Sequence, residues 1–79
     1  MKPVSHVHDP KLANAMAHPL RVRILAILDE GRASPSDLAT HLGVPVENVA
    51  YHVRVLRQYG LVRLVRRAAL VLMLFERRG

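Results

Sequence analysis

The sequence lacks cysteine, a long apolar run and a recognisable signal peptide. Without cysteine there are no disulfides, thiolate metal sites or cysteine nucleophiles, which fits a reducing compartment. The longest apolar run, residues 68–75, has eight residues, whereas a membrane-spanning helix needs about 20. The N-terminal segment MKPVSHVHDP has no apolar core that would direct secretion. We therefore expect a cytoplasmic protein without a membrane anchor.

Features that would support catalysis are also missing. A chain of 79 residues buries only about 60–65% of its unfolded surface, which leaves little room for an enclosed reaction pocket. Ser34, Ser36 and Asp37 are close in sequence, but no base with an orienting partner accompanies them. His6 and His8 in the tail have the spacing of a chelating pair, but the other three histidines, His18, His41 and His52, lie on different elements at no recognised metal-ligand spacing. We expect no enzyme, no metal site and no cofactor.

Acidic residues are scarce in the C-terminal part of the chain. Residues 1–50 contain five Lys or Arg and five Asp or Glu, whereas residues 51–79 contain seven Arg and only one acid, Glu76. The whole net charge of +6 therefore comes from the C-terminal part. A cationic region of this kind is typical of proteins that bind polyanions, while an even scatter would favour a purely solubilising role.

Two helices are predicted after a tail of residues 1–8. The first covers residues 9–17 and the second residues 19–30, with a break at a His-Pro pair between them. Gly31 is expected to end the second helix at its C′ position. Residues 9–79 are expected to form one domain. The apolar residues of the second helix follow the helical period and are expected to supply the core: Leu20, Val22, Ile24, Leu25, Ile27 and Leu28.

A helix-turn-helix pattern covers residues 34–60. Ser34 is a strong helix start, because its hydroxyl can accept from free backbone N–H groups and the proline that follows suits the first helical position. Gly43 is expected to end that helix in a left-handed conformation, and Pro45 suits the entry to the next helix, over residues 46–59. Two helices separated by about three residues are typical of a helix-turn-helix.

The helix over residues 46–59 has two different faces. Val49, Val53 and Leu56 recur at helical spacing and are expected to be buried. A recognition helix in a major groove typically exposes side chains that can hydrogen-bond base edges or phosphates. The alternative interpretation is that the exposed face of this helix is only an ordinary solvated surface. The opposite face presents such groups: Glu47, Asn48, Tyr51, Arg54 and Gln58.

The pattern after Gly60 is that of strands. Residues 61–67 alternate β-favouring residues with arginines and predict a strand. Residues 68–76 are its expected antiparallel partner, although Leu70 and Met73 also favour helix. The turn between them lacks Gly and Asn, which a tight two-residue hairpin needs. We predict a two-stranded wing and leave residues 68–76 open between strand and helix.

Three motifs together resemble the ArsR family of bacterial and archaeal transcriptional regulators. They are HPLRVRIL at 18–25, DLATHLG at 37–43 and VAYHVRVLRQYGLV at 49–62. The resemblance implies a mostly α winged helix-turn-helix, with three to four helices and two antiparallel strands. It also implies a repressor or activator that sits on double-stranded DNA, usually as a dimer. Metal-sensing members place cysteines in the helix corresponding to residues 37–42, and this chain has none.

Particular contacts with DNA follow for several residues. Asn48 can bond adenine with two hydrogen bonds, and Arg54 can reach guanine or phosphate. Glu47 can accept from cytosine or stabilise the start of its own helix. Ser36 can bind phosphate at a helix start or simply cap the helix. The full set of residues expected to contact DNA is Ser36, Val46, Glu47, Asn48, Tyr51, Arg54, Arg57, Arg63, Arg66 and Arg67.

The expected partners are double-stranded DNA and a second copy of the chain. The homodimer is expected to form through the first helix, the apolar segment 70–75, or both, and no small-molecule effector is evident. Two alternatives remain open at this point. One is a non-specific architectural DNA-binding protein of the same fold, and the other is a protein-interaction module that uses the apolar segment.

Overall fold

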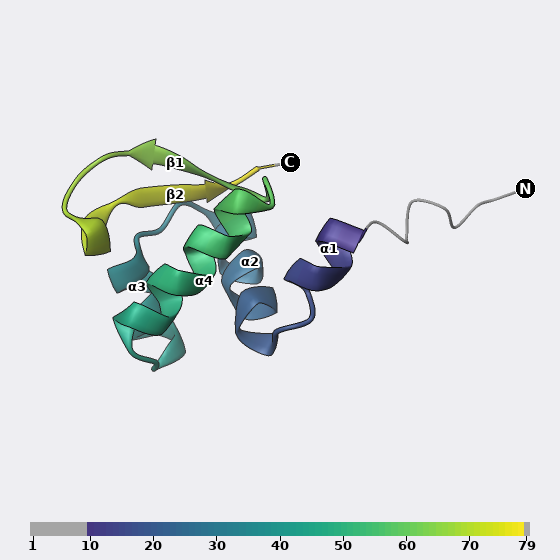
Figure 1. The fold of residues 1–79 in the computed structure, drawn as a ribbon. Coiled ribbons are helices and arrows are strands. Elements are labelled where there is room, and N and C mark those ends of the chain that lie inside the picture. Colours follow the sequence, from purple (N-terminus) through teal and green to yellow (C-terminus); the bar gives the residue numbers. More distant parts are fainter. Residues whose placement is uncertain (1–9, 79) are drawn as a thin grey trace, which may run out of the picture.

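The computed structural model describes residues 10–78, apart from the side chain of Lys11, as four α-helices followed by a two-stranded hairpin (Figure 1). α3 and α4 form the predicted helix-turn-helix and the hairpin forms the wing, so the predicted fold class is confirmed. The helices are α1 (Pro10–Ala15), α2 (Pro19–Glu30), α3 (Pro35–Leu42) and α4 (Val46–Gln58). The hairpin contains β1 (Val62–Arg66), the 3-10 helix η2 (Leu70–Leu72) and β2 (Leu74–Arg77).

Local hydrogen bonds set the boundaries of α3. The Ser34 hydroxyl accepts from Asp37 N, and Ser34 N donates to the Asp37 carboxylate, both at 3.1 Å. This reciprocal pair satisfies backbone donors that the first turn of a helix leaves free. Gly43 ends α3 with φ of 69°, which is the left-handed conformation predicted for it. Gly43, Val44 and Pro45 separate the two helices, so the predicted three-residue turn is confirmed.

α2 ends at the predicted residue. Gly31 directly follows the helix, and its φ of 169° is extended. The chain must leave α2 in extended form because Ala33 pairs with Phe75 of β2. Ala33 N donates to the Phe75 carbonyl at 3.0 Å, and Phe75 N donates to the Ala33 carbonyl at 2.9 Å. This pairing attaches the wing to the link between α2 and α3.

The first helix is shorter than predicted at its C-terminal end. α1 stops at Ala15, and its predicted start at residue 9 lies outside the described residues, as does the tail 1–8. The chain turns at residues 16–17, and His18 then caps the start of α2: Leu20 N donates to His18 Nδ1 at 3.1 Å.

The core lies between α2, α3, α4 and the inner face of the hairpin. The predicted stripe of α4 is confirmed, since Val49, Val53 and Leu56 are at most 1% exposed. Burying one large apolar side chain stabilises a fold by roughly 1.5–3 kcal/mol. Val22 is 38% exposed, contrary to prediction, because it lies about 200° around α2 from Ile24. The other buried apolar residues are Ala15, Ile24, Leu25, Leu28, Ala33, Leu38, Val62 and Phe75.

The wing combines the two alternatives left open for residues 68–76. β1 and β2 are antiparallel and pair Val62 with Arg77 and Leu64 with Phe75, with an irregularity before Arg66 pairs with Leu74. The predicted strand over 68–76 was wrong in extent, because β2 begins only at residue 74. Residues 67–73 form a wide turn that contains η2, as expected where no Gly or Asn permits a tight turn.

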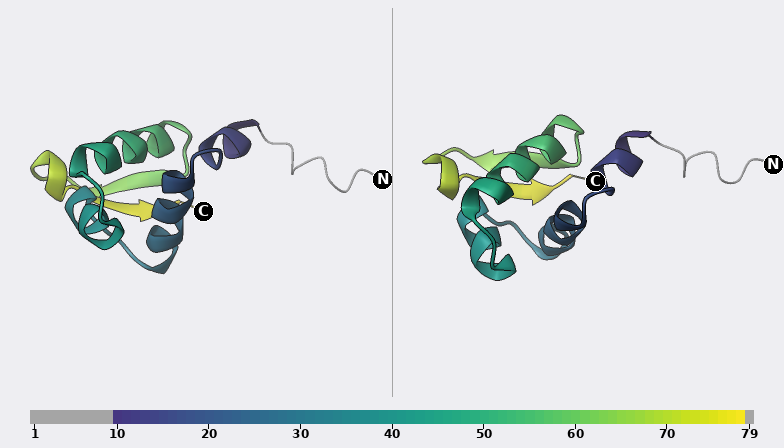
Figure 2. Two further views of the ribbon diagram at one scale, coloured as in Figure 1. Left: turned by 90° about the horizontal axis from the view of Figure 1, so that it is seen from below. Right: turned by 60° about the horizontal axis from the view of Figure 1, so that its bottom comes forward.

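The apolar end of the wing and α1 lie at opposite ends of the molecule (Figure 2). Each end exposes large apolar side chains. Leu12 and Met16 are 38% and 43% exposed near α1, and Leu70 and Leu72 are 65% and 53% exposed on η2. No helix within residues 10–78 is both long enough and apolar enough to cross a bilayer.

Candidate nucleic-acid interface

The exposed face of α4 presents the side chains that the sequence predicts to contact bases. Glu47, Asn48, Tyr51 and Arg54 are all exposed, and Val46 is half-buried in the first turn. Residues three and four apart in a helix share a face, so these side chains form one continuous surface. The buried stripe on the opposite side fixes the orientation of this surface relative to the core. α4 therefore presents hydrogen-bonding groups on a rigid element.

Ser36 lies in the first turn of α3. It is half-buried, and the capping hydrogen bonds of α3 belong to Ser34 and Asp37. The cap of α3 therefore does not depend on the Ser36 hydroxyl, which lies where free N–H groups and the helix dipole favour an anion.

The arginines of the wing fall into two groups. Arg66 ends β1 and Arg67 begins the turn, and both are exposed. Arg63 instead donates through Nε to a Glu76 carboxylate oxygen, and Arg32 Nε donates to the other oxygen at 3.0 Å. The hydrogen bond from Arg63 is the main cause that lowers the pKa of the Glu76 carboxyl, so this group is ionised at neutral pH. Glu76 thus offsets positive charge beside Arg63.

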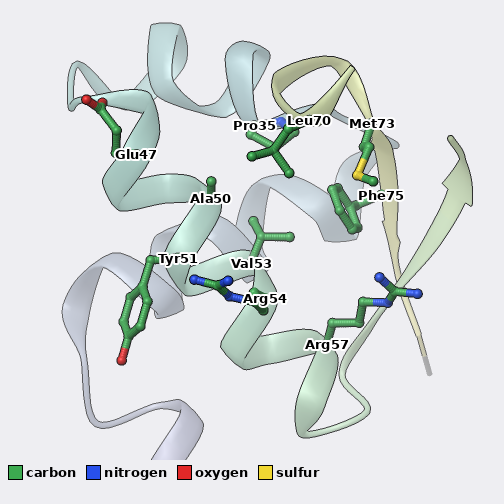
Figure 3. A pocket seen from close by; sticks show the side chains of 10 residues that line it. All are labelled: Pro35, Glu47, Ala50, Tyr51, Val53, Arg54, Arg57, Leu70, Met73 and Phe75. Carbon is green, nitrogen blue, oxygen red and sulfur yellow. The ribbon is translucent and has the colours of Figure 1, made fainter. Parts of the chain in front are cut away.

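A partly enclosed groove separates α4 from the wing (Figure 3). Its volume is about 330 Å³. Arg54 and Arg57, both predicted to contact DNA, line it together with apolar side chains from three separate segments of the chain. The complete lining is Pro35, Glu47, Ala50, Tyr51, Val53, Arg54, Arg57, Leu70, Met73 and Phe75.

A histidine cluster behind the recognition surface was not predicted from the sequence. His52 of α4 is 8% exposed, and its Nδ1 accepts from Arg21 Nε of α2 at 3.2 Å. The His18 ring centroid lies 4.3 Å from that of His52, and the Tyr51 ring packs edge-on at 5.0 Å. Burial is the main cause that lowers the His52 pKa, followed by the charges of His18 and Arg21. The cluster links α4 to α2 near Tyr51.

Sequence separation explains why this cluster was missed. His52 and Arg21 are 31 residues apart, and no local pattern relates them. The sequence placed His52 only at the margin of the buried stripe. Within residues 10–78, no cluster of three or more His, Cys, Asp or Glu could hold a metal ion.

Comparisons with known proteins agree with this architecture. Residues 16–65 match the family model described as a helix-turn-helix domain. The chain belongs to this family. It is 35% identical to the cadmium metal-sensor CMTR from Mycobacterium tuberculosis, whose NMR structure it matches with a TM-score of 0.71. That match covers 86% of this chain and 69% of the sensor.

A sequence comparison with CmtR and a second solved structure define the extent of the similarity. The HTH-type transcriptional regulator CmtR of M. tuberculosis (strain ATCC 25618 / H37Rv) is 46% identical over 52 residues, which are 66% of this chain but 44% of the relative. The homodimeric winged helix-turn-helix DNA-binding domain Mb0332 from Mycobacterium bovis, a possible ArsR-family regulator, has a TM-score of 0.78 at 20% identity. That match covers 99% of this chain and 71% of the domain. The predicted ArsR-like resemblance is confirmed.

Proposed function

We propose that this protein regulates transcription by binding double-stranded DNA at specific sequences. The observation that supports it most directly is the exposed α4 face of Asn48, Tyr51 and Arg54 beside a wing that ends in arginines, in a chain of the helix-turn-helix family. α4 lies in the major groove and the wing lies against the adjacent backbone. The relatives named above are regulators, and we propose a non-enzymatic role here as well.

Base recognition is assigned to residues 46–54 of α4. Asn48 makes paired hydrogen bonds with adenine, and Arg54 bonds guanine or a phosphate. Glu47 accepts from cytosine while it also stabilises the helix N-terminus. Val46 and Tyr51 flank these groups and contact the edges of the same bases.

Phosphate binding is assigned to the remaining cations and to the start of α3. Arg66 and Arg67 hold the backbone beside the wing, and Arg57 holds it near the end of α4. Ser36 binds a phosphate at the α3 N-terminus. Arg63 acts mainly within the wing, because its guanidinium is already bonded to Glu76.

The protein acts as a homodimer in this proposal. Mb0332, which has the same fold, is described as homodimeric. The exposed Leu12 and Met16 near α1 offer an apolar surface for a second copy, and the exposed end of the wing offers another. A dimer would bind two half-sites about one helical turn of DNA apart.

The experiment that tests the function is recovery of bound DNA. The protein is incubated with fragmented genomic DNA at near-physiological salt, and the retained fragments are sequenced. A recurring motif supports the proposal, and a palindrome with half-sites one helical turn apart supports the dimer. Retention without any motif would instead indicate an architectural DNA-binding protein, and no retention would contradict DNA binding altogether.

Arg23→Gln is the matched control for this experiment. Arg23 is exposed on α2 and has no role in the proposed interface, so its removal lowers the net charge by one without altering α4 or the wing. If Arg54→Gln and Arg23→Gln reduced retention equally, only the total charge would matter and specific contact by α4 would be contradicted.

A further inference from the structure

The groove between α4 and the wing is apolar along its floor (Figure 3). Val53 and Phe75, which form this floor, are 1% and 5% exposed. Leu70 forms an outer wall and is 65% exposed, although it lies beside the apolar floor. The groove volume of about 330 Å³ falls at the lower end of the range for small-molecule sites. An apolar compound of modest size that binds in the groove would therefore shield the Leu70 wall and the apolar floor from water.

Charge is distributed unequally along this groove. Among residues 10–78, the arginines that form ion pairs are Arg32, Arg63 and Arg77. Arg54 and Arg57 therefore line the groove without a carboxylate partner in the described part of the chain. Glu47, the one acid in the lining, lies ten residues before Arg57, about 15 Å along the helix. An anionic group is thus attracted to the Arg54 and Arg57 end and repelled from the opposite end.

We propose that this groove binds a small organic anion with an apolar body and a single carboxylate or sulfonate. The anionic group lies between Arg54 and Arg57, and the apolar body lies over Val53 and Phe75 beside Leu70. A DNA phosphate is a poor occupant of the floor, because it is strongly hydrated and has no apolar body. The three segments that form the groove are separated in sequence, so no effector site was evident from the sequence.

Ligand binding has a direct consequence for DNA, and this consequence rests on the function proposed above. Arg54 and Arg57 belong both to the groove and to the proposed DNA interface. They cannot hold the anion and the DNA together, so the ligand competes with DNA. Regulation of this kind needs no conformational change, because the two ligands share side chains.

The first test uses 1-anilinonaphthalene-8-sulfonate, an apolar sulfonate whose fluorescence rises in apolar surroundings. It is titrated into the protein and then displaced with octanoate, with 1-octanol as the uncharged control. Leu70→Ser and the double variant Arg54→Gln/Arg57→Gln should each weaken probe binding by about fivefold or more. Octanoate should displace the probe at lower concentration than octanol does.

Two matched controls separate the groove from other exposed apolar surface. Leu72 is 53% exposed on the same 3-10 helix but does not line the groove, so Leu72→Ser should retain probe binding. Arg23→Gln should do the same for charge. If Leu70→Ser and Leu72→Ser weakened binding equally, or if octanol displaced the probe as well as octanoate, the proposed site would be wrong. No fluorescence rise at all would also contradict it.

A second measurement separates this site from the proposed function. Octanoate is added to the protein bound to its recovered DNA, and release of DNA is followed by fluorescence anisotropy. Release at the concentrations that displace the probe supports competition, and DNA that stays bound while the groove fills contradicts it. If the groove variants weaken probe binding as expected but no DNA is retained, the proposed function is contradicted and the proposed ligand site is still supported. If DNA is retained and the groove variants bind the probe normally, the site fails alone.

Discussion

At the scale of single residues, burial decides which side chains are available to a partner. Asn48 and Arg54 are exposed on α4, whereas His52, on the same helix, is buried against α2. Arg63 is exposed but is bonded to Glu76, unlike its neighbours at the end of the wing. Similar residue types close in sequence therefore have different roles, and the contacts of each side chain determine which role it has.

Asn48→Ala should weaken binding to the specific DNA site by roughly 1–3 kcal/mol while leaving non-specific binding nearly unchanged. The amide is expected to recognise a base, and removing it leaves the base edge without its partner. Fluorescence anisotropy with specific and scrambled duplexes measures the difference. Gln58→Ala is the matched control, because Gln58 is an exposed amide at the far end of α4. Equal losses on both duplexes would show that Asn48 is structural.

Arg66→Gln should weaken binding to all sequences alike. Four to six phosphate contacts predict that log affinity falls with log salt at a slope of about −4 to −5, and loss of one contact makes the slope shallower by about 1. Affinities measured at several salt concentrations give the slope for each protein. Arg23→Gln should leave the slope unchanged. An unaltered slope in Arg66→Gln would place Arg66 away from the phosphates.

At the scale of elements, the positions of α3, α4 and the wing depend on one another. Leu38 of α3 is 0% exposed within the core cluster that holds the α4 stripe. Ala33 joins the wing to the start of α3 through two backbone hydrogen bonds with Phe75. The recognition face, the α3 start and the wing are therefore presented together, as binding to one DNA duplex requires.

Leu38→Ala should destabilise the protein by about 2–5 kcal/mol, because it removes buried methyl groups and leaves a cavity. The change is expected as a lower midpoint of urea unfolding, followed by circular dichroism. Leu72→Ala removes the same atoms from an exposed position and should have little effect. Similar midpoints for the two variants would contradict the assignment of Leu38 to the core.

Acidification should weaken the contact between α2 and α4. The pKa of His52 is lowered in the folded state, mainly by burial, so between that pKa and about 6.5 the unfolded chain binds more protons. The contribution of His52 to the free energy of unfolding is therefore fully present above about pH 6.5 and is lost as the pH drops through this window. Thermal unfolding measured from pH 7.5 to 5 should show this decrease.

His52→Gln should flatten this part of the pH profile. The glutamine carbonyl can still accept from Arg21 but does not titrate. His41→Gln replaces an exposed histidine of α3 and should leave the profile as it is in the parent protein. A profile that remained equally steep in His52→Gln would assign the decrease to other groups.

Local signals made much of this arrangement predictable. Ser34 and Gly43 bound α3 by chemistry within a few residues, and the α4 stripe follows from spacing alone. Features that join distant segments could not be predicted in this way: the Arg21 bond to His52, the pairing of Arg63 with Glu76, and the groove. Their partners are chosen by tertiary packing, which local periodicity does not encode.

At the scale of the whole molecule, the described residues have a cationic side and two apolar ends. The exposed apolar side chains near α1 and on η2 are candidates for the dimer contact, and they are separated by the length of the molecule (Figure 2). These two surfaces predict different dimers. Pairing near α1 leaves the wing available to DNA, whereas pairing through η2 covers it.

Leu12→Glu combined with Met16→Glu should convert the proposed dimer to a monomer, because charges would be buried at the contact. Size-exclusion chromatography with light scattering measures the mass of the particle. Leu72→Glu is the matched variant at the other end of the molecule and should leave the dimer intact. If only Leu72→Glu produced monomers, the contact would lie at the wing instead.

The separation of the two apolar ends also bears on solubility. A contact between two identical surfaces closes after one pair, but a contact between the α1 end of one molecule and the η2 end of the next leaves an unused end on each side. Such head-to-tail contacts extend into open filaments unless the geometry closes a ring. Arg66 and Arg67 precede η2 by only a few residues and place positive charge near it. This charge opposes the burial of η2 against a neighbouring molecule. Replacing the two arginines with neutral residues would therefore favour fibre growth at high protein concentration.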